Sequence, residues 1–236
     1  MPGRKGSPVA KASTIVSGML KLLAPSFLLS VPLLFWALTS SQQQPQTSRG
    51  LFEGSSDIGA TQKGSTVYDD AAGEYRVTGG GADMWGTADA FHMSWIRLSG
   101  DVTLTSDVRF PPEGAAIPLK KAVLMVRQSP DPDSAYADVA IHGDGHITLQ
   151  YRETKGGATA DITSPEHRST RLRIERKGDQ FTMYTGPADG KLTSSGSVKI
   201  MLHDPVYVGI GMCAHKADAV ETAVFSNVKI EQPAAK

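Results

Sequence analysis

The stretch DVTLTSDVRF, residues 101–110, alternates apolar and polar side chains. Val102, Leu104 and Val108 fall on one face of an extended chain and Thr103 on the other, because neighbouring side chains of a strand point to opposite sides. A helix would instead repeat its apolar residues with a period near 3.6. The stretch therefore predicts a β-strand with one face in a core and the other outside it.

Similar short runs follow one another from residue 51 onward, separated by clusters of Gly, Pro, Asp and Ser, and no convincing helical period interrupts them. The turn sequences GDG at 143–145 and KGD at 177–179 predict hairpins, since Gly adopts the positive φ angles of tight turns. We expect strands at 52–58, 65–68, 74–78, 90–98, 101–110, 121–129, 136–142, 146–153, 171–176, 180–184, 197–202, 206–214 and 221–231. Such a series predicts an all-β fold, a sandwich of two packed antiparallel sheets.

Composition and charge narrow the classes of protein. The chain has 236 residues, 40% of them hydrophobic, with 24 basic and 24 acidic side chains. This composition excludes a disordered chain, a collagen, a coiled coil and a polytopic membrane protein. Residues 1–41 hold four basic and no acidic side chains, so the rest holds 20 basic and 24 acidic ones and is mildly acidic. We expect no nucleic-acid partner, and we interpret the mixed-charge run at 168–177 as a solvated strand face.

The N-terminal segment indicates export. Residues 22–39 read LLAPSFLLSVPLLFWALT, a charge-free run that follows the basic segment. This pattern is typical of a signal peptide, and a retained membrane anchor helix is the alternative. Either way the rest of the chain crosses the membrane, so we expect a periplasmic or extracellular protein that meets the membrane only through this segment. We expect a signal or anchor at 1–41, a linker at 42–50 and the sandwich at 51–231, with the oligomeric state left open.

Longer stretches carry a resemblance to a known family. They are GEYRVTGGGADMWGTADAFHMSWIRLSGDVTLTSDVRF at 73–110, KAVLMVRQSPDPDSAYADVAIHGDGHITLQYRE at 121–153, YVGIGMCAH at 207–215 and AVFSNVKI at 223–230. Together they resemble the concanavalin-A-like jelly-roll modules of secreted bacterial proteins, which are often found near TolB-type propellers. The resemblance covers residues 51–231. It implies two curved sheets and a carbohydrate or polymer ligand, with no defined catalytic residues. Here we expect the module to stand alone, so the roles of companion domains do not transfer.

A candidate ligand site lies on the meander 121–153. Alternation places polar side chains on one face of each of its three strands, and these faces form one surface if the strands align. Planar polar groups beside an aromatic ring suit a sugar, whose hydroxyls take paired hydrogen bonds and whose C–H face stacks on the ring. The alternative is an ordinary solvated face with cross-strand ion pairs. The candidate residues are Arg127, Tyr136, Asp138, His142, Gln150 and Arg152.

Two further features admit two interpretations each. Trp85 sits in the glycine-rich stretch GGGADMWG at 79–86, where it can stack on a sugar or cap the end of the sandwich. Gly209 and Gly211 lie on one face of the strand 206–214 and leave room there. Either a large side chain such as Trp95 covers them or a ligand groove runs past them.

Catalytic and metal-binding patterns are weak. The chain lacks the Glu-x-Asp-x-x-Glu run of concanavalin-like hydrolases and the GxSxG nucleophile motif, and Cys213 lies inside an apolar strand. His142 and His146 flank a turn without further evident ligands, so we predict no zinc site. The pair Asp131 and Asp133 favours a turn, with calcium binding as the alternative. We therefore expect no catalytic residue and no cofactor.

These observations rank three functions. The first is an exported, non-catalytic module that binds a carbohydrate or polymer. The second is a structural or protein-interaction domain of the bacterial envelope. The third is a glycan-active hydrolase, which the missing carboxylate pattern disfavours.

Overall fold

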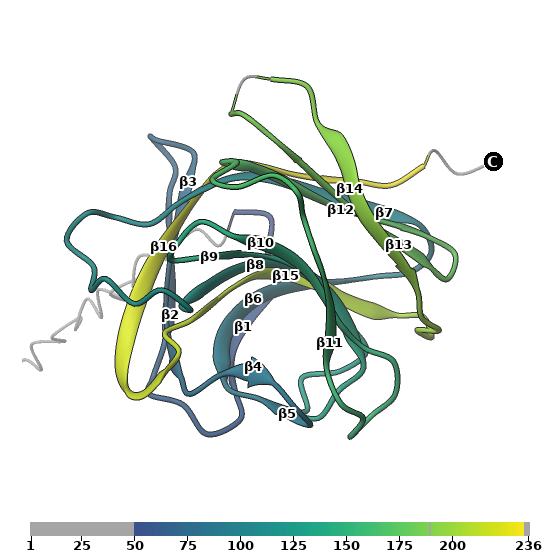
Figure 1. The fold of residues 1–236 in the computed structure, drawn as a ribbon, viewed down its shortest axis with the longest axis horizontal. Coiled ribbons are helices and arrows are strands. Elements are labelled where there is room, and N and C mark those ends of the chain that lie inside the picture. Colours follow the sequence, from purple (N-terminus) through teal and green to yellow (C-terminus); the bar gives the residue numbers. More distant parts are fainter. Residues whose placement is uncertain (1–49, 189, 234–236) are drawn as a thin grey trace, which may run out of the picture. The chain divides into compact units, whose positions relative to one another are not determined.

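The computed structural model describes residues 50–188 and 190–233 (Figure 1). All the secondary-structure elements within these ranges are β-strands. The predicted signal or anchor segment lies outside these residues, as does the linker apart from Gly50. No helix within the described ranges has the length and apolar character needed to span a membrane. The strands are β1 (Gly54–Ile58), β2 (Ser65–Asp69), β3 (Glu74–Gly81), β4 (Met84–Trp85), β5 (Ala88–Asp89), β6 (Phe91–Leu98), β7 (Val102–Arg109), β8 (Lys121–Arg127), β9 (Tyr136–His142), β10 (Ile147–Arg152), β11 (Ala160–Thr163), β12 (Arg171–Lys177), β13 (Gln180–Gly186), β14 (Thr193–Lys199), β15 (Val206–Cys213) and β16 (Lys216–Glu231).

Two seven-stranded antiparallel sheets form the sandwich. Sheet A has the order β1-β6-β15-β8-β9-β10-β11, and sheet B has the order β14-β13-β12-β7-β16-β3-β2. A separate hairpin pairs β4 with β5. Strands that are distant in sequence are neighbours in both sheets, since β15 lies between β6 and β8, and β16 between β7 and β3. This architecture confirms the predicted all-β fold, a sandwich of two packed antiparallel sheets.

The main core fills the space between the sheets. Strand β7 contributes Val102, Leu104 and Val108 to this core, which confirms the inner face predicted for residues 101–110. From β8 it takes Leu124 and Val126, and all of these side chains are almost fully buried. Each such side chain contributes about 1.5–3 kcal/mol through removal of apolar surface from water.

The outer face of sheet A, the face that points away from sheet B, carries a second apolar cluster. Met84 of the β4–β5 hairpin lies fully buried there with Phe91 and Met93 of β6 and Val123 of β8. Because this cluster covers their outer faces, β8 and β9 are buried on both sides. This explains why the sequence of β8 is nearly continuous in apolar residues instead of alternating.

The two glycines of β15 are explained by packing. A Cβ atom at Gly209 would lie 1.8 Å from the carbonyl oxygen of Ser94 and 3.0 Å from Met93 Cε, and one at Gly211 would lie 2.9 Å from the carbonyl oxygen of His92 and 3.0 Å from the ring of Phe91. The packing interpretation is therefore right, but Phe91 and Met93 are the covering side chains. Trp95 instead lies against Gly54 of β1 and Tyr207 of β15.

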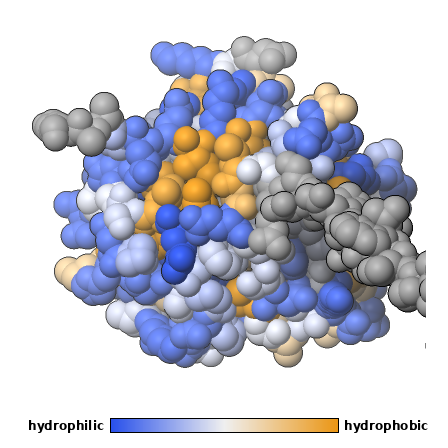
Figure 2. All heavy atoms as spheres, turned by 180° about the vertical axis from the view of Figure 1, so that it is seen from behind, coloured by the Kyte–Doolittle hydropathy of each residue, from blue (hydrophilic) through white to orange (hydrophobic). Residues whose placement is uncertain are grey.

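Three short strands, several strand bounds and one charged side chain differ from the sequence-based expectations. β4, β5 and β11 were not expected, and β14 ends at Lys199 where the prediction placed a strand to residue 202. In the basic run, Arg176 is buried instead of solvated, and it donates to Asp204 Oδ1 (2.6 Å) and to the carbonyl of Leu202 (2.9 Å). Figure 2 shows the rear side, where a large apolar area lies among hydrophilic residues.

Candidate functional site

A pocket of about 290 Å³ opens on the outer face of sheet A, over the end of β8 to β11 that carries His142. Its floor comes from these strands, and its walls come from the β4–β5 hairpin and from residues beside β8, β9 and β15. We call it the histidine pocket because three histidines line it. The lining residues are Asp83, Trp85, Leu119, Lys121, His142, His146, Thr148, Gln150, Asp161 and His215.

Strand register brings the floor residues together. Lys121 of β8 is paired with His142 of β9, and Gln150 of β10 lies between Asp138 of β9 and Asp161 of β11. Residues directly opposite each other in antiparallel strands point to the same face, so these side chains share the outer face. The three predicted polar faces of the meander therefore coincide.

Lys121 joins the floor to the wall. Its side chain is 3% exposed, and its ammonium group donates to Asp83 Oδ1 (2.6 Å) and to the carbonyl of Met84 (3.0 Å). The same ammonium group lies 5.7 Å from the ring centroid of Trp85, which is 41% exposed at the rim. The hairpin that carries Trp85 is thus fixed to the sheet, and the indole is presented to the pocket.

Two histidines stack at the end of the pocket. The rings of His142 and His146 lie 3.6 Å apart at an angle of 21°, and His146 Nδ1 contacts Asp144 Oδ1 at 2.6 Å. Burial, together with the neighbouring His146 and Lys121, lowers the pKa of His142 to about 3. At neutral pH His142 is therefore an uncharged ring with one hydrogen-bond donor and one acceptor.

Several buried polar atoms of this face lack a hydrogen-bond partner among the described residues. They include His142 Nδ1, Gln150 Oε1 and both carboxylate oxygens of Asp138. An unsatisfied buried polar atom costs about 1–3 kcal/mol, so such atoms in a pocket are suited to a bound molecule. Burial raises the pKa of Asp138 well above its usual range, which favours the uncharged form of this carboxyl group.

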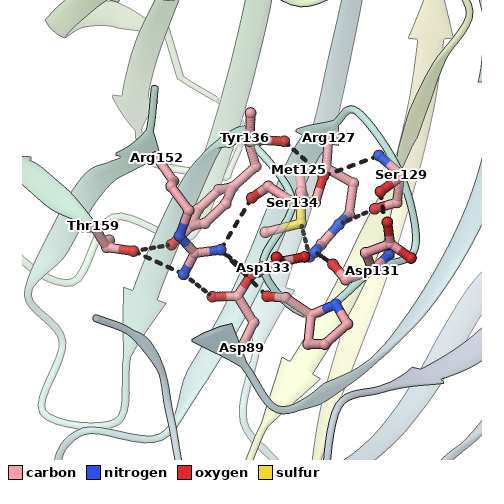
Figure 3. A network of polar contacts seen from close by, with 12 residues as sticks. Asp89, Met125, Arg127, Ser129, Asp131, Asp133, Ser134, Tyr136, Arg152 and Thr159 are labelled. Carbon is pink, nitrogen blue, oxygen red and sulfur yellow. Dashed lines mark hydrogen bonds and ion pairs between the residues drawn. The ribbon is translucent and has the colours of Figure 1, made fainter. Parts of the chain in front are cut away.

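The other half of the outer face is closed by a buried ion-pair network (Figure 3). Arg152 donates to Asp89 Oδ1 (2.7 Å) and Oδ2 (2.9 Å), and Arg127 Nη2 lies 3.4 Å from Asp89 Oδ2. The side chains of all three residues are 0% exposed, and the ring of Tyr136 lies beside both guanidinium groups. Arg127 also donates to the carbonyl of Asp131 (2.6 Å), so the network fastens both the hairpin and the loop after β8 to the sheet.

The predicted site residues divide into two groups. His142, Gln150 and Trp85 line the histidine pocket. Arg127, Tyr136, Asp138 and Arg152 share the same face but are fully buried beneath the hairpin and its neighbouring loops. The alternative of a solvated sheet face is wrong for these four, while ligand contact by the first three stays a prediction. Trp85 lies in strand β4 and not in an irregular loop.

Sequence reasoning did not select several of the pocket residues. Lys121 and Thr148 could have been found, because each is separated by an even number of residues from a selected residue on the same strand and therefore shares its face. Asp83, Leu119 and His215 come from other parts of the chain, and no local pattern announces that they meet. Asp161 lies on β11, a strand that was not expected from the sequence.

The metal and nucleophile candidates have structural explanations. Asp131 and Asp133 contact the ammonium group of Lys155 at 2.5 and 3.5 Å, and this hydrogen bond lowers the pKa of Asp131. Within the described ranges, no three His, Cys, Asp or Glu residues are grouped to hold a metal ion. Cys213 is buried, and burial raises the pKa of its thiol to about 12, so it is no thiolate at neutral pH.

Comparison with known proteins gives the fold and no family. No protein-family model matches the chain, and no curated protein matches it. Among solved structures, a functionally unknown protein from Saccharomyces cerevisiae matches with a TM-score of 0.55 and 17% identity, over 77% of this chain and 97% of that one. A Bacillus licheniformis β-glucanase (TM-score 0.44, 9% identity, 75% and 92% covered) and a family 7 alginate lyase (0.46, 10%, 70% and 82%) are more distant. The chain therefore shares its sandwich fold with the yeast protein.

Proposed function

We propose that the protein binds a carbohydrate or a similar hydroxyl-rich polymer in the histidine pocket and does not convert it. One observation carries the proposal: an exposed indole stands beside buried polar groups whose hydrogen-bonding capacity is unused. Trp85 offers an apolar ring face, while Gln150 and His142 offer polar atoms without partners among the described residues. A sugar ring matches this combination, because it has an apolar C–H face and a rim of hydroxyl groups.

The size of the pocket supports a small binding unit. Its volume of about 290 Å³ is close to the lower end of the roughly 300–1,000 Å³ that ligand pockets span. Lys121 and Thr148 add donor and acceptor groups to the floor. The pocket is thus suited to one or two sugar units.

Binding is favoured over hydrolysis by the state of the nearby carboxyl groups. A glycosidase needs two carboxyl groups on either side of the scissile bond, one of them protonated. Asp83 is held by Lys121, and Asp138 has no exposed surface through which to reach a substrate. Asp161 is then the one carboxyl group of the pocket lining that is free of Lys121 and exposed.

A panel of immobilised neutral glycans tests the proposal with the full-length protein. Gln150→Ala and Trp85→Ala should each lower the affinity at least fivefold, because truncating a residue that contacts a ligand costs more than about 1 kcal/mol. Gln62→Ala makes the same chemical change at an exposed position outside the pocket and should leave binding unchanged. Absence of binding to every glycan would favour the structural or protein-interaction role, and release of reducing sugar would favour a hydrolase.

We further propose export of the protein. The charge-free run at residues 22–39 behind a basic segment supports it. A tag at the C-terminus should be recovered outside the cytoplasm on cell fractionation. Recovery of the full-length chain in the soluble cytoplasmic fraction would contradict export.

A further inference from the structure

We infer that the histidine pocket receives the end of a saccharide chain and not an internal stretch. The inference rests on the proposed carbohydrate binding and adds the mode of recognition. An internal stretch needs a cleft that is open at both ends, so that the chain can continue in both directions. The outer face of sheet A offers a pocket that is closed on three sides.

The first closed side lies along the strands, toward Arg127 and Tyr136. These residues occupy the same strand faces as Lys121 and His142, and they are 0% exposed. Asp89 lies over them, with its carboxylate bound by Arg152 in a two-point contact (Figure 3). A sugar chain lying along β9 would therefore meet a filled, ion-paired layer beyond Gln150.

The second closed side lies across the strands, toward β15 and β6. Here Met84 of the hairpin is 0% exposed and packs among Phe91, Met93 and Val123. This apolar cluster occupies the outer face of the central strands. A sugar chain running across the sheet from β11 would therefore end against the hairpin.

Backbone hydrogen bonds fix these closing elements in place. The amide of Asp89 donates to the carbonyl of Pro132 (2.9 Å), and the amide of Thr159 donates to the carbonyl of Gly86 (2.8 Å). The hairpin is thus bound to the loops that follow β8 and β10, in addition to the ion pairs beneath it. Opening a through-going cleft would break both hydrogen bonds and expose the buried charges.

Along the strands in the opposite direction the pocket ends at the stacked rings of His142 and His146, and across the strands, away from the hairpin, it leads outward past β11, the edge strand of sheet A. Its Asp161 lines the pocket and is exposed. A chain whose last unit lies between Trp85 and Gln150 can leave the pocket on this side.

The charges around the pocket favour a neutral sugar. Lys121 is paired with Asp83, and His146 is in contact with Asp144. Asp161 adds a negative charge, and no described basic side chain forms an ion pair with it. The third histidine of the lining, His215, lies 3.5 Å from Asp83 instead. An acidic sugar would be repelled by Asp161, so neutral oligomers are the appropriate probes.

Oligomer length separates the two modes of binding. The probes are linear oligomers of one, two, three and six units of glucose, galactose, mannose, xylose and N-acetylglucosamine, measured by calorimetry on the full-length protein. End recognition predicts that the affinity levels off, with less than a twofold change between three and six units. An affinity that still rises tenfold between three and six units would overturn end recognition but keep carbohydrate binding. No binding in any series would refute the proposed function itself, and the inference with it.

The number of chain ends provides a second measurement. A polysaccharide of the best-bound sugar is compared with the same polysaccharide after partial acid hydrolysis, at equal mass. End recognition predicts that the protein bound per milligram rises in proportion to the number of chain ends. An unchanged amount of bound protein would contradict it. Trp85→Ala should bind less to both samples, which shows that the signal comes from the histidine pocket.

Discussion

Replacement of Asp89 by Asn is expected to destabilise the protein strongly. The carboxylate of Asp89 is 0% exposed and lies between two guanidinium groups that are equally buried. Asn keeps the size of the side chain but removes its charge, so the two guanidinium groups lose their shared counter-ion. Removing one partner of a buried ion pair costs about 3–5 kcal/mol, because the remaining charge is left uncompensated in a medium of low dielectric.

The expected loss of stability can be measured as a decrease in the melting temperature, Tm. For a domain of this size, a loss of about 3–5 kcal/mol lowers Tm by roughly 10 °C. Far-ultraviolet circular dichroism of the β signal follows the transition, and urea unfolding gives the free energy independently. The matched control is Asp131→Asn, which breaks an exposed contact with Lys155 and should leave Tm unchanged. If Asp89→Asn shifts Tm by no more than this control, the charged network does not hold the hairpin as described.

Three further outcomes follow from burial. Tyr136→Ala removes a fully buried ring, so it should lower stability by about 3 kcal/mol or more in urea unfolding, and a loss below 1 kcal/mol would contradict its placement. Because His142 has a folded pKa of about 3, the unfolded chain binds a proton below pH 6.5 that the folded chain does not, so stability falls by up to about 1.4 kcal/mol per pH unit between pH 6.5 and 3. Compared with the wild type, the His142→Gln variant should lack this part of the pH dependence. If the stability of both proteins changes with pH in the same way, the prediction is wrong. Cys213, with its pKa raised to about 12, should resist iodoacetamide at pH 8 until urea unfolds the chain, and rapid labelling of the folded protein would disprove its burial.

The strands of the sandwich were predictable where one face is buried and the other is not. In β7, Val102 and Leu104 alternate with threonines, and this period of two identifies both the strand and its inner face. β9 was placed from Tyr136 to His142 because a clear turn follows it. β4 and β5 are two residues long each, which is too short to show a period. They form because the ion pair of Asp89 and the burial of Met84 hold this hairpin on sheet A.

The site was predictable only in part. Alternation correctly placed Arg127 and His142 on one face of the meander, since pairing within a meander is local. It could not tell that Asp89, far upstream, covers one of them and leaves the other at a pocket. What lies over a sheet face depends on contacts distant in sequence, and a single sequence carries no local sign of them.

The position of Trp85 gives the protein an optical reporter of its own. The emission of an indole shifts to shorter wavelength when water around it is displaced, and Trp85 is 41% exposed at the rim of the pocket. Trp95 is packed against Gly54 and Tyr207, so its surroundings should stay constant when the pocket fills. A change in tryptophan fluorescence on titration can therefore be assigned by comparison with the Trp85→Phe variant, so that pocket occupancy is read in solution without attaching a dye.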